Sequence, residues 1–142
     1  VTIPSSAVLA SDQSGFPSSF PAVTNHLASA NDVMDLSWTS TGQPTVVFFS
    51  INWTGFGNAG GYSATAQLLH TKQFTGGIGT VVEKTISVSG SNNADNIRTV
   101  FININPSVGS NTVKLRFANT GSRGGATVLA AGTSIFLLET KK

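Results

Sequence analysis

The last third of the chain restricts the fold most strongly, because short β-type runs alternate there with turn residues. From residue 98 onward, four runs rich in Val, Ile, Thr and Phe are separated by clusters of Gly, Ser, Asn and Pro. The run 112–118 has a period of two, with apolar side chains on one face and basic ones on the other: Val113, Leu115 and Phe117 against Lys114 and Arg116. This pattern predicts antiparallel strands with one face in a core.

Similar runs occur along most of the preceding sequence, separated by segments rich in Gly, Pro or Asn. The expected strands are 33–40, 45–52, 62–72, 81–89, 97–105, 112–118, 126–130 and 133–140. A spacing of about 10 to 12 residues, and about eight or nine strands in all, predict an all-β fold. We therefore expect one domain built as an antiparallel jelly roll or β-sandwich.

Residues 1–31 differ from the rest of the chain. They hold three of the five prolines and many serines, and they show no clean hydrophobic period. Pro17 and Pro21 are unfavourable both in a central strand and in a helix interior. We expect residues 1–31 to form an irregular lead-in, or a linker from an upstream shaft, and residues 32–142 to form a β-sandwich head domain.

Charged residues are scarce. They make up 10% of the 142 residues, against about 25% in an ordinary soluble domain. The shortage of Lys and Glu disfavours helices, and a surface with few charges is expected where one subunit faces another. The composition thus agrees with a strand-rich chain that associates with other copies.

Several function classes find no support in the sequence. The net charge is only +2 and the basic residues are dispersed, whereas nucleic-acid binding needs clustered cations. The chain has no cysteine, no apolar run long enough to cross a membrane as a helix, and no nucleotide-binding or hydrolase motif. The Asn-rich turn 91–96 offers oxygen atoms to calcium, but its single carboxylate favours an ordinary hydrogen-bonded turn. We expect no catalysis, no cofactor and no membrane insertion.

The ionisable residues show no catalytic or metal-ligand spacing. His70 lies on an expected strand beside apolar residues, which favours a packed or interface role, and His26 lies in the lead-in. Asp32 and Asp35 are three residues apart, which predicts opposite faces of a strand. Glu139 is expected to pair with a Lys or Arg. We predict no catalytic residue and no metal site.

The segment 53–62 is the best candidate for a binding site. It holds Trp53, Phe56, Asn58 and Tyr62 among four glycines. Aromatic faces stack on the apolar patches of sugars while amides read the hydroxyl groups, so the composition suits carbohydrate. The alternative is that Trp53 and Tyr62 are strand-end residues packed in the core or against a neighbouring subunit.

The segment 107–142 reads SVGSNTVKLRFANTGSRGGATVLAAGTSIFLLETKK. It resembles the closing strands of C1q/TNF-like jelly-roll domains, as they occur at the C-terminal tips of phage tail fibres and of bacterial collagen-like surface filaments. The shared features are a strand of the TVKLRF type, a Gly-rich turn and a short ATV strand. The final shared feature is the last strand, which begins after Gly132 and carries Glu139.

The resemblance implies a homotrimer that recognises cell surfaces, including their glycans. It predicts a non-catalytic C-terminal head of a phage tail fibre or a similar fibrous adhesin. Such a head would lie at a virion fibre tip or on an extracellular surface and bind a host receptor, expected to be a glycan. Apolar strand faces within 47–49 or 135–138 would line the trimer contacts. Two alternatives stay open: a structural trimerisation cap or capsid decoration domain without ligand, and a stand-alone lectin or carbohydrate-binding module.

Overall fold

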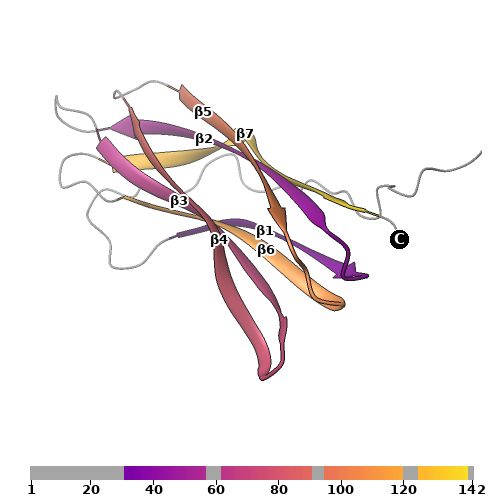
Figure 1. Ribbon diagram of the computed structural model, residues 1–142. Coiled ribbons are helices and arrows are strands. Elements are labelled where there is room, and N and C mark those ends of the chain that lie inside the picture. Colours follow the sequence, from indigo (N-terminus) through magenta and orange to yellow (C-terminus); the bar gives the residue numbers. More distant parts are fainter. Residues whose placement is uncertain (1–30, 57–61, 91–94, 120–124, 141–142) are drawn as a thin grey trace, which may run out of the picture.

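The computed structural model describes residues 31–56, 62–90, 95–119 and 125–140. These residues form strands joined by short connections and contain no helix (Figure 1), so the predicted all-β fold is confirmed. The seven strands are β1 (Asn31–Ser40), β2 (Thr45–Phe56), β3 (Tyr62–Phe74), β4 (Gly77–Gly90), β5 (Asp95–Ile104), β6 (Gly109–Asn119) and β7 (Gly125–Glu139). The expected lead-in 1–31 lies outside the described residues, except for Asn31, which opens β1.

The strands form two antiparallel sheets that face each other as a sandwich. One sheet has four strands in the order β1-β6-β3-β4, and the other has three in the order β5-β2-β7. β1 pairs with β6, and β2 lies between β5 and β7, so most neighbours in each sheet are distant in sequence. Figure 1 shows the two layers, with the β3–β4 hairpin projecting beyond the body. The predicted antiparallel β-sandwich is therefore confirmed, with seven strands among the described residues.

The core lies between the sheets and follows the alternation of side chains along each strand. In β6 the three apolar residues of the period-two run, Val113, Leu115 and Phe117, are each at most 1% exposed. They pack with the inward side chains of the opposite sheet, such as Phe49 of β2 and Leu137 of β7. The prediction for the run 112–118 is therefore confirmed.

β7 joins two segments that the sequence separates at Gly132. The register between β2 and β7 shifts between Ser50 and Asn52, so β7 continues through a bulge. Gly132 supplies the left-handed backbone there, with φ of +82°. The Thr133 hydroxyl accepts a hydrogen bond of 2.9 Å from the Asn52 backbone N–H. Gly132, which separates the two expected strands 126–130 and 133–140, thus lies at a bend within the single strand β7.

The β3–β4 hairpin is longer than expected. The expected strands 62–72 and 81–89 leave residues 73–80 between them, but Phe74 pairs with Gly77 and only Thr75 and Gly76 lie between the strands. Gly77 has φ of +131°, which makes this tight reversal possible.

A second bulge, in β1, places Asp32 and Asp35 on the same face, so the prediction that they lie on opposite faces is wrong. The register with β6 shifts between Asp32 and Met34, so Asp32 pairs with Arg116 and Asp35 pairs with Lys114. Both aspartates are exposed and both lie on the outer face. The odd spacing does not separate them, because one extra residue restores the same side.

Candidate functional site

The predicted sugar-binding segment is only partly described. Trp53 is 4% exposed and belongs to the core, where it is paired across the ladder with Val128. The Trp53 indole therefore packs in the core, which was the alternative to sugar binding, and its ring face is not open to a ligand. Phe56 ends β2 and Tyr62 opens β3, so the chain brings both to the same connection. Their side chains, and Asn58 as a whole, lie outside the described residues.

Three phenylalanines gather on the outer face of the three-stranded sheet. Phe48 of β2 is paired on one side with Phe101 of β5 and on the other with Phe136 of β7. The centroid of the Phe48 ring lies 6.0 Å from that of the Phe101 ring and 6.1 Å from that of the Phe136 ring, and both ring pairs are tilted. Phe101 is 71% exposed and Phe136 is 38% exposed. We call these three residues the aromatic row.

The positions around the aromatic row carry no charge. Alternation and register place three residues of each strand on the three central outward rows. These nine residues are Val46, Phe48 and Ser50 of β2, Thr99, Phe101 and Asn103 of β5, and Ser134, Phe136 and Leu138 of β7. The nine positions define the neutral face, and none of them holds Asp, Glu, Lys or Arg.

The opposite outer face is charged. Asp32 of β1 receives a hydrogen bond of 3.1 Å from Lys114 Nζ and one of 3.0 Å from Arg116 Nε. Desolvation raises the pKa of the Asp32 carboxyl, but the bonds from Arg116 and Lys114 outweigh it and hold that pKa below its usual range. The two faces of the sandwich therefore differ in kind. One is typical of a surface in water, and the other exposes aromatic rings without charges.

Buried polar groups tie the sheets together at the end where β7 finishes. Glu139 is 1% exposed and accepts hydrogen bonds from the Trp38 indole (2.8 Å), the Thr41 backbone N–H (2.8 Å) and the Thr41 hydroxyl (2.7 Å). Burial alone would raise the pKa of Glu139, but the bonds from Thr41 and Trp38 keep it below its usual range. The expectation that Glu139 pairs with a Lys or Arg is wrong for the described residues, because its partners are neutral donors.

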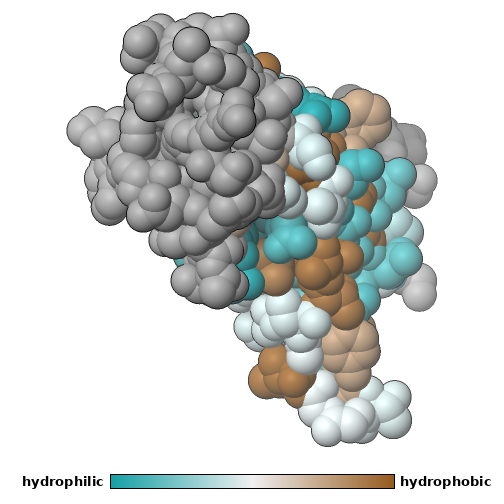
Figure 2. Space-filling model, turned by 90° about the vertical axis from the view of Figure 1, so that its left-hand side faces the viewer, coloured by the Kyte–Doolittle hydropathy of each residue, from teal (hydrophilic) through white to brown (hydrophobic). Residues whose placement is uncertain are grey.

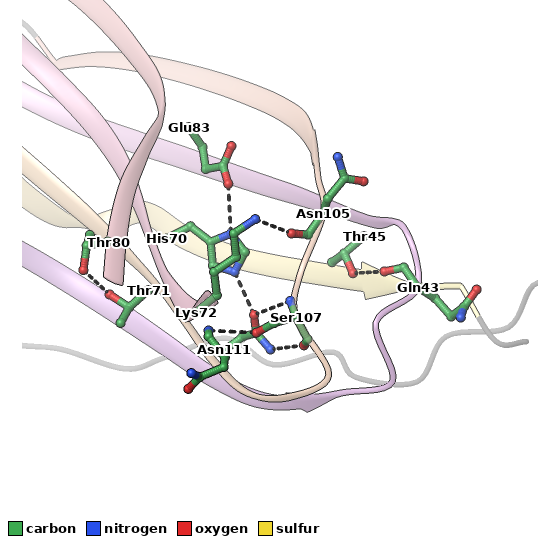
Figure 3. Close-up of polar contacts among 11 residues, drawn as sticks. Gln43, Thr45, His70, Thr71, Lys72, Thr80, Glu83, Asn105, Ser107 and Asn111 are labelled. Atoms are coloured by element: carbon green, nitrogen blue, oxygen red, sulfur yellow. Dashed lines mark hydrogen bonds and ion pairs between the residues drawn. The ribbon is translucent and has the colours of Figure 1, made fainter. Parts of the chain in front are cut away.

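His70 has the packed role that the sequence predicts. It is fully buried inside one subunit and bonds to Glu83 and Asn111 (Figure 3). Among the described residues, no group of three or more His, Cys, Asp or Glu side chains is placed to hold a metal ion. The same residues contain no helix long and apolar enough to cross a membrane.

The neutral face was only half visible in the sequence. Phe48 lies within the range 47–49 and Phe136 within 135–138, the two ranges expected to line subunit contacts. Their neighbours Val47, Phe49 and Ile135 are buried in the core of the same subunit. Phe101 was missed as a surface residue, because only the pairing of β5 with β2 brings it beside Phe48.

No known family profile matches this sequence, and no curated protein matches it. Among solved structures, two weak matches come from one virus. One is of the Gt strain of infectious bursal disease virus, with 12% identity over 95% of this chain and a TM-score of 0.43. The other is of the Gx strain of the same virus, with 10% identity over 99% of this chain and a TM-score of 0.35. This chain spans about a third of each of those chains, 36% in both cases.

Proposed function

We propose that this chain is a non-catalytic, homotrimeric head domain of a fibrous attachment protein, at the tip of a viral tail fibre or on another extracellular surface. The observation that carries the proposal is the neutral face of the β5-β2-β7 sheet, an exposed aromatic row without charges. The likeness of residues 107–142 to C1q/TNF-like heads supplies the three-fold arrangement.

Self-association explains the neutral face better than exposure to water does. Full burial of one phenylalanine side chain contributes roughly 1.5–3 kcal/mol. Phe101, at 71% exposed, would gain most of this on association, and the partly buried Phe48 and Phe136 would gain less. Aromatic residues are enriched and charged residues are depleted at the centres of protein interfaces. Copies of one surface that meet around a symmetry axis bring like charges together, so a charge-free face suits contact between identical chains.

Attachment to a host surface is the second part of the proposal. A trimer presents three copies of each loop in one direction, which turns weak single-site binding into useful avidity. The connection between β2 and β3 holds Phe56, Asn58 and Tyr62, whose residue types suit a glycan. Because Trp53 packs in the core, a sugar would be read by these three residues without it.

A glycan array probed with the trimer tests the attachment role. We expect reproducible binding that is lost in Asn58→Ala and in Tyr62→Ala. Trp53→Phe is the matched control, because it keeps an aromatic ring in the core and should leave binding unchanged. Binding that survives both loop variants would contradict the assignment of the loop.

The burial of Trp53 favours one alternative, a structural trimerisation cap or capsid decoration domain. That role needs the same fold and the same neutral face but no ligand. A blank array from a protein that light scattering shows to be trimeric would establish it in place of adhesion. A monomer that binds glycans would instead indicate a stand-alone lectin or carbohydrate-binding module.

A further inference from the structure

His70 is a fully buried histidine with a hydrogen-bond partner at each ring nitrogen. It lies in β3 and is 0% exposed. Nδ1 is 2.9 Å from Glu83 Oε1, and Nε2 is 2.9 Å from Asn111 Oδ1. Figure 3 shows the ring between these two side chains, which come from β4 and β6. The protonation state of the ring therefore follows from what each partner can accept or donate.

Asn111 fixes the proton at Nε2. The Asn111 amide nitrogen donates to the Ser107 carbonyl (2.7 Å) and to the Gly109 carbonyl (2.9 Å), so both of its N–H groups are used. The amide oxygen must then be the atom that faces His70, and it also accepts from the Ser107 backbone N–H at 3.2 Å. An oxygen that only accepts requires a hydrogen on Nε2.

Glu83 requires a second proton at the other nitrogen. The register between β3 and β4 shifts between Leu68 and Leu69 and leaves Glu83 as the extra residue of a bulge, where its side chain is aimed at His70. An ionised carboxylate only accepts, so the 2.9 Å contact with Nδ1 needs a proton between the two atoms. Glu83 is 20% exposed, so water reaches part of the carboxylate while the ring itself is fully buried.

The surroundings of the ring agree with a positive charge. The Trp38 indole stacks on His70 with ring centroids 5.8 Å apart and an interplanar angle of 18°. The titratable group in contact with the ring is Glu83 on β4, while Glu139 on β7 lies behind Trp38 and Lys72 lies two residues along the same strand. The other cations of these strands are outside the core: Lys84 of β4 is exposed, and Lys114 and Arg116 of β6 bind Asp32 on the outer face. Toward the ring, β6 contributes the neutral Asn111. The nearest of these groups is thus a carboxylate.

The contacts of His70 lie at the base of the β3–β4 hairpin. Lys72 Nζ donates to the Asn105 carbonyl at 2.7 Å, and the Gln73 backbone N–H donates to the Ser107 hydroxyl at 2.9 Å. These two bonds join the hairpin to the segment between β5 and β6, and the His70–Asn111 bond joins it to β6 (Figure 3). Beyond this base the β3–β4 hairpin projects from the body (Figure 1). It forms the narrow lower end of the molecule in Figure 2, where the surface is white to brown and so neutral to hydrophobic. The exposed apolar residues of the hairpin are Phe74, Ile78 and Val82.

We propose that a proton held between His70 and Glu83 fastens the base of the β3–β4 hairpin to the sandwich, so that the hairpin loosens when this proton leaves. Without the proton, the Nδ1 lone pair faces a carboxylate oxygen across 2.9 Å inside the protein. That contact is repulsive, and it is relieved by movement of β4 away from β3. The device is independent of trimer formation and of glycan binding.

Nuclear magnetic resonance tests the proton directly. The probe is the full chain with His26→Gln, so that every imidazole signal comes from His70, titrated over the pH range in which the protein stays folded. We expect both ring nitrogens to be protonated wherever the hairpin amides are protected. When one proton leaves, hydrogen exchange at residues 77–83 and 105–111, corrected for its intrinsic pH dependence, should speed up about 10- to 100-fold. A neutral ring in a fully protected hairpin would overturn the proposal.

Glu83→Gln distinguishes a His70 whose shared proton holds the hairpin from a His70 that is only packed in the core. The glutamine amide can donate to a neutral Nδ1, so the variant should show a single protonated nitrogen and keep its hairpin protected at every pH. The control is Asp35→Asn, which removes an exposed carboxylate from β1 and should behave as the parent. If Glu83→Gln and the parent show the same pH dependence of exchange, the proton does not fasten the hairpin.

Discussion

Glu139→Gln tests the buried hydrogen bonds that join β7 to β1. The carboxylate accepts from Thr41 through Oε1 and from the Trp38 indole through Oε2. The glutamine amide has only one oxygen. If that oxygen stays with Thr41, the new NH₂ group faces the indole N–H and two buried donors meet.

The cost follows from this mismatch. One hydrogen bond to a charged acceptor is lost, which is worth about 1.5–3 kcal/mol, and a buried unsatisfied donor costs about 1–3 kcal/mol. The two bonds from Thr41 survive but become bonds to a neutral oxygen. Because the site can relax in part, we expect the free energy of unfolding to fall by about 3 kcal/mol, which is a large share of the total for a domain of this size.

The assay is denaturation by guanidinium chloride, followed by circular dichroism at one fixed protein concentration. Trp38→Phe in the Glu139→Gln background removes the opposing indole N–H, so the double variant should lose less than the sum of the two single losses. The pH dependence gives a second readout. The pKa of Glu139 is lowered in the folded state, so its contribution is present above the unfolded pKa and is lost as the pH falls through the folded one.

Glu139→Gln should therefore flatten the acid side of the stability profile. A loss below about 0.5 kcal/mol, or strictly additive single variants, would refute the reasoning, because surface substitutions already produce effects of that size. Asp35→Asn on the exposed side of β1 is the charge-matched control and should stay within that limit.

Three further predictions concern stability. Phe117→Ala should lower the free energy of unfolding by about 3–5 kcal/mol, because the Phe117 ring is 1% exposed. Thr112→Ala, on the other face of β6, is the control and should change that free energy little. Equal losses in the two variants would contradict the packing. Asp32→Asn should cost at most about 1 kcal/mol at neutral pH, and this cost should disappear in high salt. Because the pKa of Asp32 is lowered in the folded state, the cost should also fade as the pH drops through that pKa, so a cost that persists in acid would contradict the ion pairs. Gly132→Ala should cost about 1–2 kcal/mol in thermal unfolding, because its φ is +82° and a Cβ would lie 3.3 Å from Ile97; an unchanged melting temperature would exclude this strain.

The sequence predicts the layers of the fold well, because alternation along a strand is a local property. Val113, Leu115 and Phe117 alternate with Lys114 and Arg116, and this suffices to give the inward face of β6. The same rule fails at bulges, where one extra residue reverses the parity. This is why Asp32 and Asp35 share a face, and why Glu83 points at His70.

The candidate surfaces were harder to predict, because they depend on which strands are neighbours. Phe48 is 53 residues from Phe101 and 88 residues from Phe136 in sequence (101 − 48 and 136 − 48), and only the order β5-β2-β7 brings the three together. The aromatic content of the segment 53–62 was visible at once, but composition does not show depth. Trp53 looks like a ligand platform in sequence and is a core residue in the sandwich.

Sedimentation equilibrium of the parent and of a Phe101→Lys, Phe136→Lys double variant tests most directly whether the neutral face joins three copies. For the parent we predict a mass near three times 14.6 kDa. The double variant should be a folded monomer, because lysines at two outward positions would place like charges together at the axis. A parent that stays monomeric at high concentration, or a variant that remains trimeric, would contradict the account.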